Sequence, residues 1–215
     1  MRPFADVGDL SGLVRDALGT ECRIVAVDRL RGGSRKGVYR VRLDGSHAAS
    51  VIICSWAEAE NFWSGAPESD PADPLAPASG LVPFRTAQRS LNSFGARVPR
   101  VLLADDSRRR YPADVAVVED VSGGTLEALF ETDPTRAAGA LGELAGMLEA
   151  MHRYRARHHG RPDLLERGGS ASEISCERRI LDRALRALDE AAGRDDRITP
   201  ADTARATACG NWPVG

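Results

Sequence analysis

Residues 30–41 read LRGGSRKGVYRV, and this stretch decides the fold that the sequence predicts. Its first part carries three glycines, and its second part begins the β-rich run 38–43. Another β-rich run, residues 22–30, leads into the glycines. Because glycine adopts the backbone angles of tight turns without a steric penalty, the pattern predicts two antiparallel strands joined by a glycine-rich loop.

The residues that follow extend this pair of strands into a larger sheet. Asp44-Gly45 marks a hairpin turn, since both residue types tolerate positive backbone angles, and residues 48–56 form a third β-rich run. Residues 100–104 and the apolar run 115–118 predict two further strands. The sequence therefore predicts a single five-stranded antiparallel sheet.

Two helices are expected alongside these strands. Residues 9–18 carry an apolar stripe at helical spacing and end before Gly19, and residues 84–94 carry a second stripe and end before Gly95. We expect the second helix to pack on the sheet. The preceding residues 64–83 hold five prolines among small and acidic residues, a composition that predicts a flexible loop.

From residue 122 onward the sequence predicts helices only. Residues 125–130, 134–152 and 172–192 have helical patterns, and Thr199-Pro200 is typical of a further helix start. Five side chains of the long helix share one face and are expected to be buried: Leu141, Leu144, Ala145, Leu148 and Met151. The chain thus divides into a sheet part, residues 1–121, and a helical part, residues 122–215, which is an α+β arrangement.

Composition narrows the classes of partner. The chain of 215 residues has 29 basic and 31 acidic residues and a formal net charge of −2. This balance offers no electrostatic reason to expect nucleic acid or an anionic membrane as a partner. The start lacks an apolar signal core, and no apolar run of about 18 residues occurs, so we expect a cytoplasmic protein.

The cysteines do not indicate a metal site. Cys22, Cys54, Cys176 and Cys209 lie far apart and show none of the paired spacings of zinc or redox motifs. We expect them to be small buried hydrophobic residues, and we expect no metal ligands among them.

The glycine-rich loop is the first candidate for chemistry. Free backbone N–H groups and basic side chains can donate to phosphate oxygens where the backbone approaches closely. The residues of this candidate phosphate-binding loop are Gly32, Gly33, Ser34, Arg35, Lys36 and Gly37. The loop matches neither a Walker motif nor a full Gly-x-Gly-x-x-Gly motif. An ordinary glycine-rich hairpin without a bound phosphate would have the same pattern.

The order of motifs resembles the aminoglycoside phosphotransferase family. The motifs in order are the glycine-rich hairpin, the third strand, a helix before Val98-Pro99-Arg100-Val101, a strand ending in Val117-Val118-Glu119-Asp120-Val121, Gly123-Gly124-Thr125-Leu126 and the helix that ends at Met151-His152. The similarity covers residues 22–152 and extends loosely into the later helices.

This resemblance implies a protein-kinase-like fold and activity. Residues 1–121 would form a nucleotide-binding N-lobe, and residues 122–215 would form part of a helical C-lobe. ATP or GTP with Mg²⁺ would lie between the lobes, with phosphates under residues 32–37. The purine would bond to the backbone of Glu119, Asp120 and Val121, which we term the hinge, and a small-molecule hydroxyl would accept the phosphoryl group.

The third strand departs from the family pattern. Relatives usually carry a lysine there and a partner glutamate on the next helix, whereas this strand ends Ile53-Cys54-Ser55-Trp56 and the helix offers only Gln88. Either Lys36 or Arg35 supplies the missing charge from the loop, or the site lacks it. Glu58 and Glu60 are expected to be solvated surface charges rather than an acidic site.

The catalytic loop is also absent from its expected place. Phosphoryl transfer needs an aspartate that orients the hydroxyl, and an Asn and an Asp that hold magnesium. Residues 159–163 read HGRPD, lack the following Asn and come too early, so we interpret them as a polar linker. We expect a chain truncated before its catalytic loop and inactive by itself, with no catalytic residues and no Mg²⁺ ligands.

Two alternatives stay open at this point. A non-catalytic, pseudokinase-like module that binds a nucleotide or another ligand would also lack these residues. An α+β domain unrelated to kinases is the other alternative, and the acceptor substrate cannot be inferred because fold similarity does not fix it.

Overall fold

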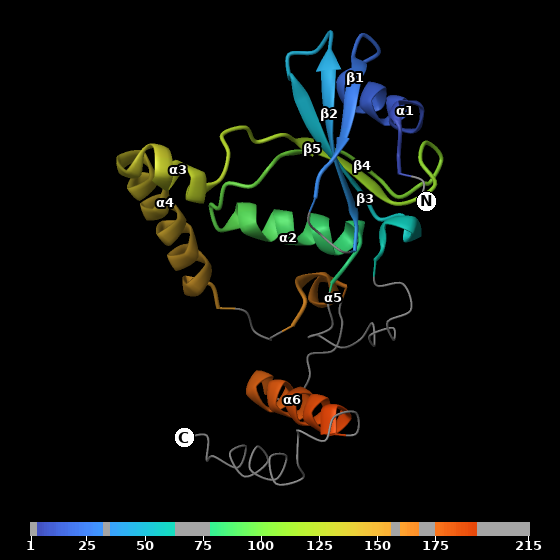
Figure 1. Cartoon of the computed structure of the whole chain (residues 1–215). Coiled ribbons are helices and arrows are strands. Elements are labelled where there is room, and N and C mark those ends of the chain that lie inside the picture. The colour runs from blue at the N-terminus through green and yellow to red at the C-terminus, as the bar shows by residue number, and fades with distance from the viewer. Residues whose placement is uncertain (1–3, 32–34, 63–77, 156–159, 168–174, 193–215) are drawn as a thin grey trace.

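The computed structural model describes residues 4–31, 35–62, 78–155, 160–167 and 175–192. A five-stranded sheet forms its centre, with one helix on each face and further helices beside and below it (Figure 1). The strands are β1 (Arg23–Arg29), β2 (Gly37–Asp44), β3 (Ser50–Ser55), β4 (Val101–Asp105) and β5 (Val115–Glu119). Their order is β1-β2-β3-β5-β4, and every neighbouring pair is antiparallel, which confirms the predicted α+β fold.

The predicted turn between β2 and β3 is present. Gly45 has a φ of 72°, in the left-handed region that favours glycine. A Cβ at this position would also lie 2.5 Å from the carbonyl oxygen of Glu21, so a close backbone approach requires the glycine as well. The sequence pattern predicted the turn, and the fold adds the second constraint.

Helix α1 (Val7–Leu18) covers one face of the sheet. Asp6 caps its first turn by accepting a hydrogen bond from the backbone N–H of Asp9, and the Asp9 carboxylate accepts one from the N–H of Asp6. This capping box explains why the helix begins two residues before the predicted start. Leu10, Leu13 and Val14 are fully buried against the sheet, where they join the main hydrophobic core.

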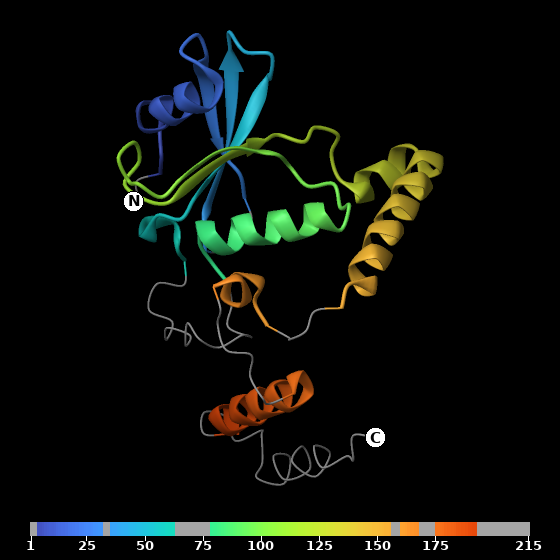
Figure 2. The same cartoon turned by 180° about the vertical axis from the view of Figure 1, so that it is seen from behind.

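Helix α2 (Leu81–Ser93) covers the opposite face, as both views show (Figures 1 and 2). Leu81 and Phe84 pack with Ala116 and Val118 of β5, which confirms the predicted packing. The helix begins at Leu81, so the last three residues of the predicted loop 64–83 are helical. Residues 78–80 precede the helix, and residues 64–77 of that predicted loop lie outside the described residues.

Helices α3 (Leu126–Thr132) and α4 (Pro134–Arg153) follow the sheet and contact each other. The side chains of Thr125 and Asp133 cap the N-termini of α3 and α4. Both caps lie within one residue of the predicted helix starts at 125 and 134. The predicted buried stripe on α4 is wrong, because Leu141, Leu144 and Leu148 are 46%, 40% and 44% exposed. Helical spacing places these side chains on one face, but no described segment covers that face.

The predicted linker at residues 159–163 is a helix in part. Pro162 begins α5 (Pro162–Glu166), and Asp163 is buried, with its carboxylate accepting two hydrogen bonds from Arg161 at 2.6 and 3.1 Å. Helix α5 lies against α2, where Glu166 pairs with Arg89 at 2.6 Å. The linker interpretation was therefore wrong for Pro162 and Asp163, which belong to this helix.

The last described element is α6 (Cys176–Ala192), which starts later than the predicted residue 172. It lies apart from the sheet in both views (Figures 1 and 2). The helix predicted from Thr199 lies outside the described residues. None of the described helices is both long enough and apolar enough to cross a lipid bilayer.

Candidate functional site

The structure describes half of the predicted phosphate-binding loop: Arg35, Lys36 and Gly37, while Gly32, Gly33 and Ser34 lie outside the described residues. Gly37 is buried at the start of β2, opposite Ser55 of β3. A Cβ on Gly37 would lie 2.5 Å from Cδ of Glu60. The packing of the Glu60 side chain therefore requires this glycine, whether or not a phosphate approaches the loop.

Glu60 is buried, contrary to the sequence-based expectation. It ends the short 3-10 helix η1 (Glu58–Glu60) and is 2% exposed, whereas Glu58 is exposed. Its carboxylate accepts hydrogen bonds from Nη2 and Nε of Arg29, at 2.8 and 3.2 Å, and from the Tyr39 hydroxyl. No periodic signal marks Glu60, because its partners come from two other strands that only the fold brings together.

This buried cluster holds the base of the glycine-rich loop. Burial, reinforced by the hydrogen bond to Glu60, raises the pKa of Tyr39 to about 12, so its hydroxyl remains a donor. The hydrogen bond to Glu60 also raises the pKa of Arg29. Arg29 and Tyr39 face each other across β1 and β2, and the N–H of Leu30 donates to the Val38 carbonyl at 2.8 Å. The two ends of the loop are therefore fixed at one place.

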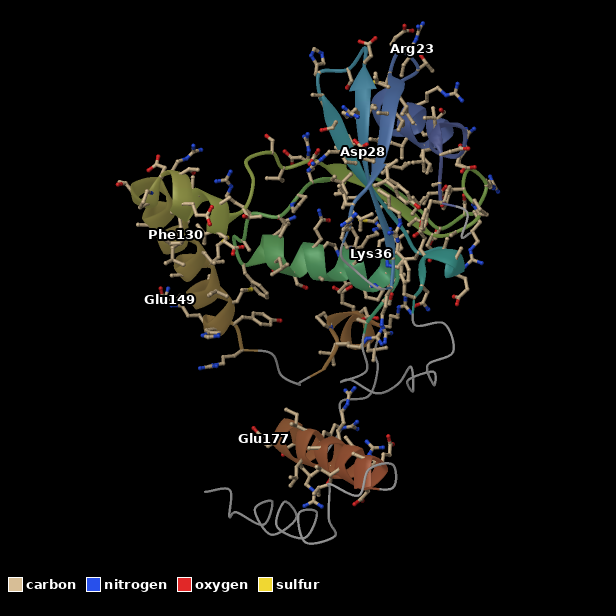
Figure 3. All side chains as sticks on the ribbon, in the orientation of Figure 1. Arg23, Asp28, Lys36, Phe130, Glu149 and Glu177 are labelled. Carbon is tan, nitrogen blue, oxygen red and sulfur yellow. The ribbon has the colours of Figure 1, made fainter. Side chains whose placement is uncertain are left out.

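Lys36 extends from the loop across the α2 face of the sheet. Its Nζ lies 5.7 Å from the ring centroid of Trp56 and 5.2 Å from that of Phe84. Its charge also acts on the buried Cys54 thiol of β3. Burial raises the pKa of that thiol, and the neighbouring Lys36 charge opposes the rise. Figure 3 labels Lys36 where the loop passes α2.

Arg35 and Lys36 line a cavity of about 430 Å³ with Trp56, Phe84 and Ala87. The residues just before α2 complete its wall. Two cations beside an aromatic surface suit an anionic ligand, because charge-assisted hydrogen bonds are stronger than neutral ones. The described part of the loop thus contributes two cations to the lining of this cavity.

The hinge residues lie at the end of β5. Arg40 of β2 reaches Asp120 with two hydrogen bonds, from Nε at 2.7 Å and Nη2 at 3.1 Å, and the Ser50 hydroxyl donates a third at 2.6 Å. Burial opposes ionisation of Asp120, but these hydrogen bonds outweigh it and lower the pKa of the carboxyl group. Asp120 is therefore a fixed anion that ties the hinge to β2 and β3.

Glu119 and Val121 differ in what their backbone can still bind. The N–H of Glu119 donates to the Arg100 carbonyl at 2.9 Å, and its carboxylate accepts from the N–H of Arg100 at 3.2 Å. Val121 is 64% exposed, and within the described ranges no group accepts a hydrogen bond from its amide. Among the described residues, the backbone donor of Glu119 is thus occupied, whereas that of Val121 is available.

The loop and the hinge do not share one cavity. Gly37 pairs with Ser55 and Glu119 pairs with Val51, so the two segments are four residues apart along β3, or about 13 Å. Glu119 and Asp120 line a separate cavity of about 730 Å³ that reaches the turn at Gly45. This cavity is the larger of the two, but the loop cations line only the smaller one.

The described residues do not form a magnesium site. In the ranges that the structure covers, no group of three or more His, Cys, Asp or Glu side chains could hold a metal ion. Gln88, the polar residue nearest the missing glutamate position, donates to the Pro99 carbonyl at 2.6 Å instead. The described residues thus do not fit magnesium, and we derive no step through it.

The antiparallel five-stranded sheet with its helices is the α+β arrangement of a protein-kinase-like fold. A family model described as a phosphotransferase enzyme family, APH, matches residues 29–210. The match spans most of the chain, so the chain belongs to this family, which confirms the resemblance inferred from the motifs. Comparisons with curated proteins and with solved structures return no match.

Proposed function

We propose that this chain binds ATP or GTP along the α2 face of its sheet. The observation that carries the proposal is the position of Arg35 and Lys36 in one cavity at the root of the glycine-rich loop. The phosphates would lie against these two cations and residues 32–37, and the purine would bond to the backbone of the hinge, where the Val121 amide is available.

The reaction that we propose for the family site is phosphoryl transfer to a hydroxyl group of a small molecule. The γ-phosphoryl group would pass from the nucleotide to the hydroxyl oxygen, and the nucleoside diphosphate would leave. In this class the nucleotide is normally loaded with magnesium, which neutralises charge on the β- and γ-phosphates. The residues described here contribute nucleotide binding and orientation to this reaction.

A second function is a non-catalytic nucleotide-binding module. The observation in its favour is the neutral Cys54 on the central strand together with the absence of a metal-binding cluster in the described ranges. Such a module would bind ATP or GTP as proposed above but would transfer no phosphate. Binding and turnover measured on the same preparation distinguish the two functions.

Calorimetric titration with ATP and with GTP tests the binding proposal. We expect weak affinity that falls with salt, because exposed charge contacts are screened at physiological ionic strength. Arg35→Ala combined with Lys36→Ala should weaken binding by about 1–3 kcal/mol, if each makes a charge-assisted hydrogen bond. Thermal stability should change little, since Arg35 is exposed and Lys36 half-buried.

A matched control removes two charges elsewhere. Arg15 and Arg136 are exposed on α1 and α4, away from both cavities, and their double replacement by alanine preserves the change in net charge. This control should bind nucleotide like the wild type. Equal affinity in the wild type and the Arg35/Lys36 variant would remove the role of the loop, and no binding by the wild type would refute the proposed function.

A further inference from the structure

Lys36 is the only lysine of the chain, and its ammonium lies over the rings of Trp56, which follows the central strand β3, and Phe84 of α2. Cys54 in that strand is 4% exposed and lies opposite Val38 of β2 and Ala116 of β5. Its thiol supplies no positive charge at this central position. The Lys36 ammonium, which belongs to the loop before β2, lies near the end of the same strand, 5.7 Å from the ring centroid of Trp56.

Two aromatic rings hold the ammonium there. Trp56 follows β3, Phe84 lies in the first turn of α2, and the two rings are in contact with centroids 5.5 Å apart. Lys36 Nζ is 5.7 Å from one centroid and 5.2 Å from the other, within the range of cation–π attraction. The side chain is therefore positioned by contacts from two separate elements.

The kind of partner matters for what the ammonium can still bind. A carboxylate partner would take hydrogen bonds from the ammonium and neutralise its charge, whereas an aromatic face attracts the cation without accepting its hydrogen bonds in that way. Within the described ranges, no carboxylate pairs with Lys36. Among the described residues, no carboxylate thus neutralises its charge, which can attract an anion in the cavity.

We propose that Lys36, held over Trp56 and Phe84, binds the nucleotide phosphates from the place that a lysine at position 54 would otherwise reach. Trp56 and Phe84 are then positioning residues, and Cys54 leaves room for the incoming side chain. This inference rests on the proposed function, since it assigns the phosphate contact of the same nucleotide site. It goes further by predicting that the lysine can be moved from the loop to the strand.

The test is titration of ATP and GTP into the wild type and three variants of the full chain. Lys36→Met should weaken binding about tenfold or more, the size expected for one charge-assisted hydrogen bond. Arg35→Met, the matched control at the neighbouring exposed cation, should have the smaller effect. Lys36→Met combined with Cys54→Lys should recover most of the lost affinity, because the ammonium returns to the same cavity.

A second set of variants tests the aromatic contacts. It does not require that the variant with a buried lysine at position 54 folds. Phe84→Leu and Trp56→Leu should weaken binding when Lys36 is present and cause no further loss in the Lys36→Met background, whereas Trp56→Phe should retain affinity. This non-additivity is the signature of a positioning role, since a general loss of packing would act in both backgrounds. Thermal unfolding of each variant verifies that it is folded.

The outcomes separate this inference from the proposed function. Nucleotide binding by the wild type with equal affinity in Lys36→Met would overturn the inference and leave the proposed function standing. A folded double variant without recovery, or additive effects of Phe84→Leu and Lys36→Met, would also overturn it. No binding by the wild type would overturn both.

Discussion

Arg40 and Asp120, 80 residues apart in the sequence, form an ion pair through two hydrogen bonds of 2.7 and 3.1 Å. The Asp120 side chain is 8% exposed and the Arg40 side chain 44% exposed. The pair connects β2, an inner strand of the sheet, to the residue that follows β5. It thereby fixes the first residues of the segment that we propose as the purine-binding hinge.

Asp120→Asn should lower the free energy of unfolding by about 1 kcal/mol at neutral pH, since the partner guanidinium is solvent-exposed and the lost charge is partly screened. The folded state lowers the pKa of this carboxyl group. Its stabilisation is therefore present above the ordinary carboxyl pKa of about 3.9 and is lost as the pH falls through the lower folded value. Urea unfolding from pH 7 to pH 2 measures this difference between wild type and variant.

The control for this prediction is Asp106→Asn. Asp106 is exposed in the turn after β4, so the replacement removes one carboxylate without breaking a described ion pair. It should leave the unfolding midpoint unchanged. A difference between Asp120→Asn and wild type that stays constant down to pH 2 would show that the ion pair contributes no stability through its charge.

Gly37→Ala should destabilise the fold by about 1–3 kcal/mol, the usual cost of forcing extra volume into a packed region. The new Cβ would lie 2.5 Å from Cδ and 2.6 Å from Oε1 of Glu60, both held by Arg29 and Tyr39. Gly139→Ala is the matched control, because this helical glycine of α4 has nothing within 4 Å of the added carbon. That change should raise stability by about 0.5–1 kcal/mol. Thermal unfolding that shows equal effects at both positions would contradict the assigned packing.

Tyr39→Phe should alter how stability depends on alkaline pH. Burial and the hydrogen bond to Glu60 raise the pKa of Tyr39 to about 12. The resulting stabilisation is fully present below the unfolded pKa of about 10 and is lost as the pH rises through 12. The wild type should therefore lose on the order of 2 kcal/mol between pH 10 and 12 that the variant does not lose.

Denaturant unfolding at pH 8, 10 and 12, compared between wild type and Tyr39→Phe, measures this loss. Tyr111 is a useful internal reference, because burial also raises its pKa and it is present in both proteins. Parallel curves for the two proteins across this range would mean that the Tyr39 hydroxyl has an ordinary pKa in the folded chain.

The chain of 215 residues should show no measurable phosphate transfer to aminoglycosides with magnesium and ATP or GTP. Positioning and charge neutralisation supply most of the rate in this reaction, and the described residues hold no metal-binding cluster. Transfer of labelled γ-phosphate to kanamycin is the assay. Robust transfer would contradict this prediction and direct attention to Asp163 and Asp182, which pair with Arg161 and Arg178, and to Asp202.

Local patterns in the sequence were sufficient to predict the sheet. The turn at Gly45 and the glycine-rich loop specified that β2 is the neighbour of β1 and of β3, because short connections between antiparallel strands leave few alternatives. The order of short motifs was also sufficient to indicate the family. These signals depend on residues that are close together in the chain, so they can be interpreted without knowledge of the fold.

Only the tertiary structure decided which polar side chains are buried and what they contact. Glu60 meets Arg29 and Tyr39 from two strands, and Lys36 meets Trp56 and Phe84 from two further elements. Conversely, the sequence pattern of α4 predicts a buried apolar face, but that face is exposed in the described structure. Burial depends on which surface lies opposite a side chain, and a one-dimensional pattern specifies a face without specifying what covers it.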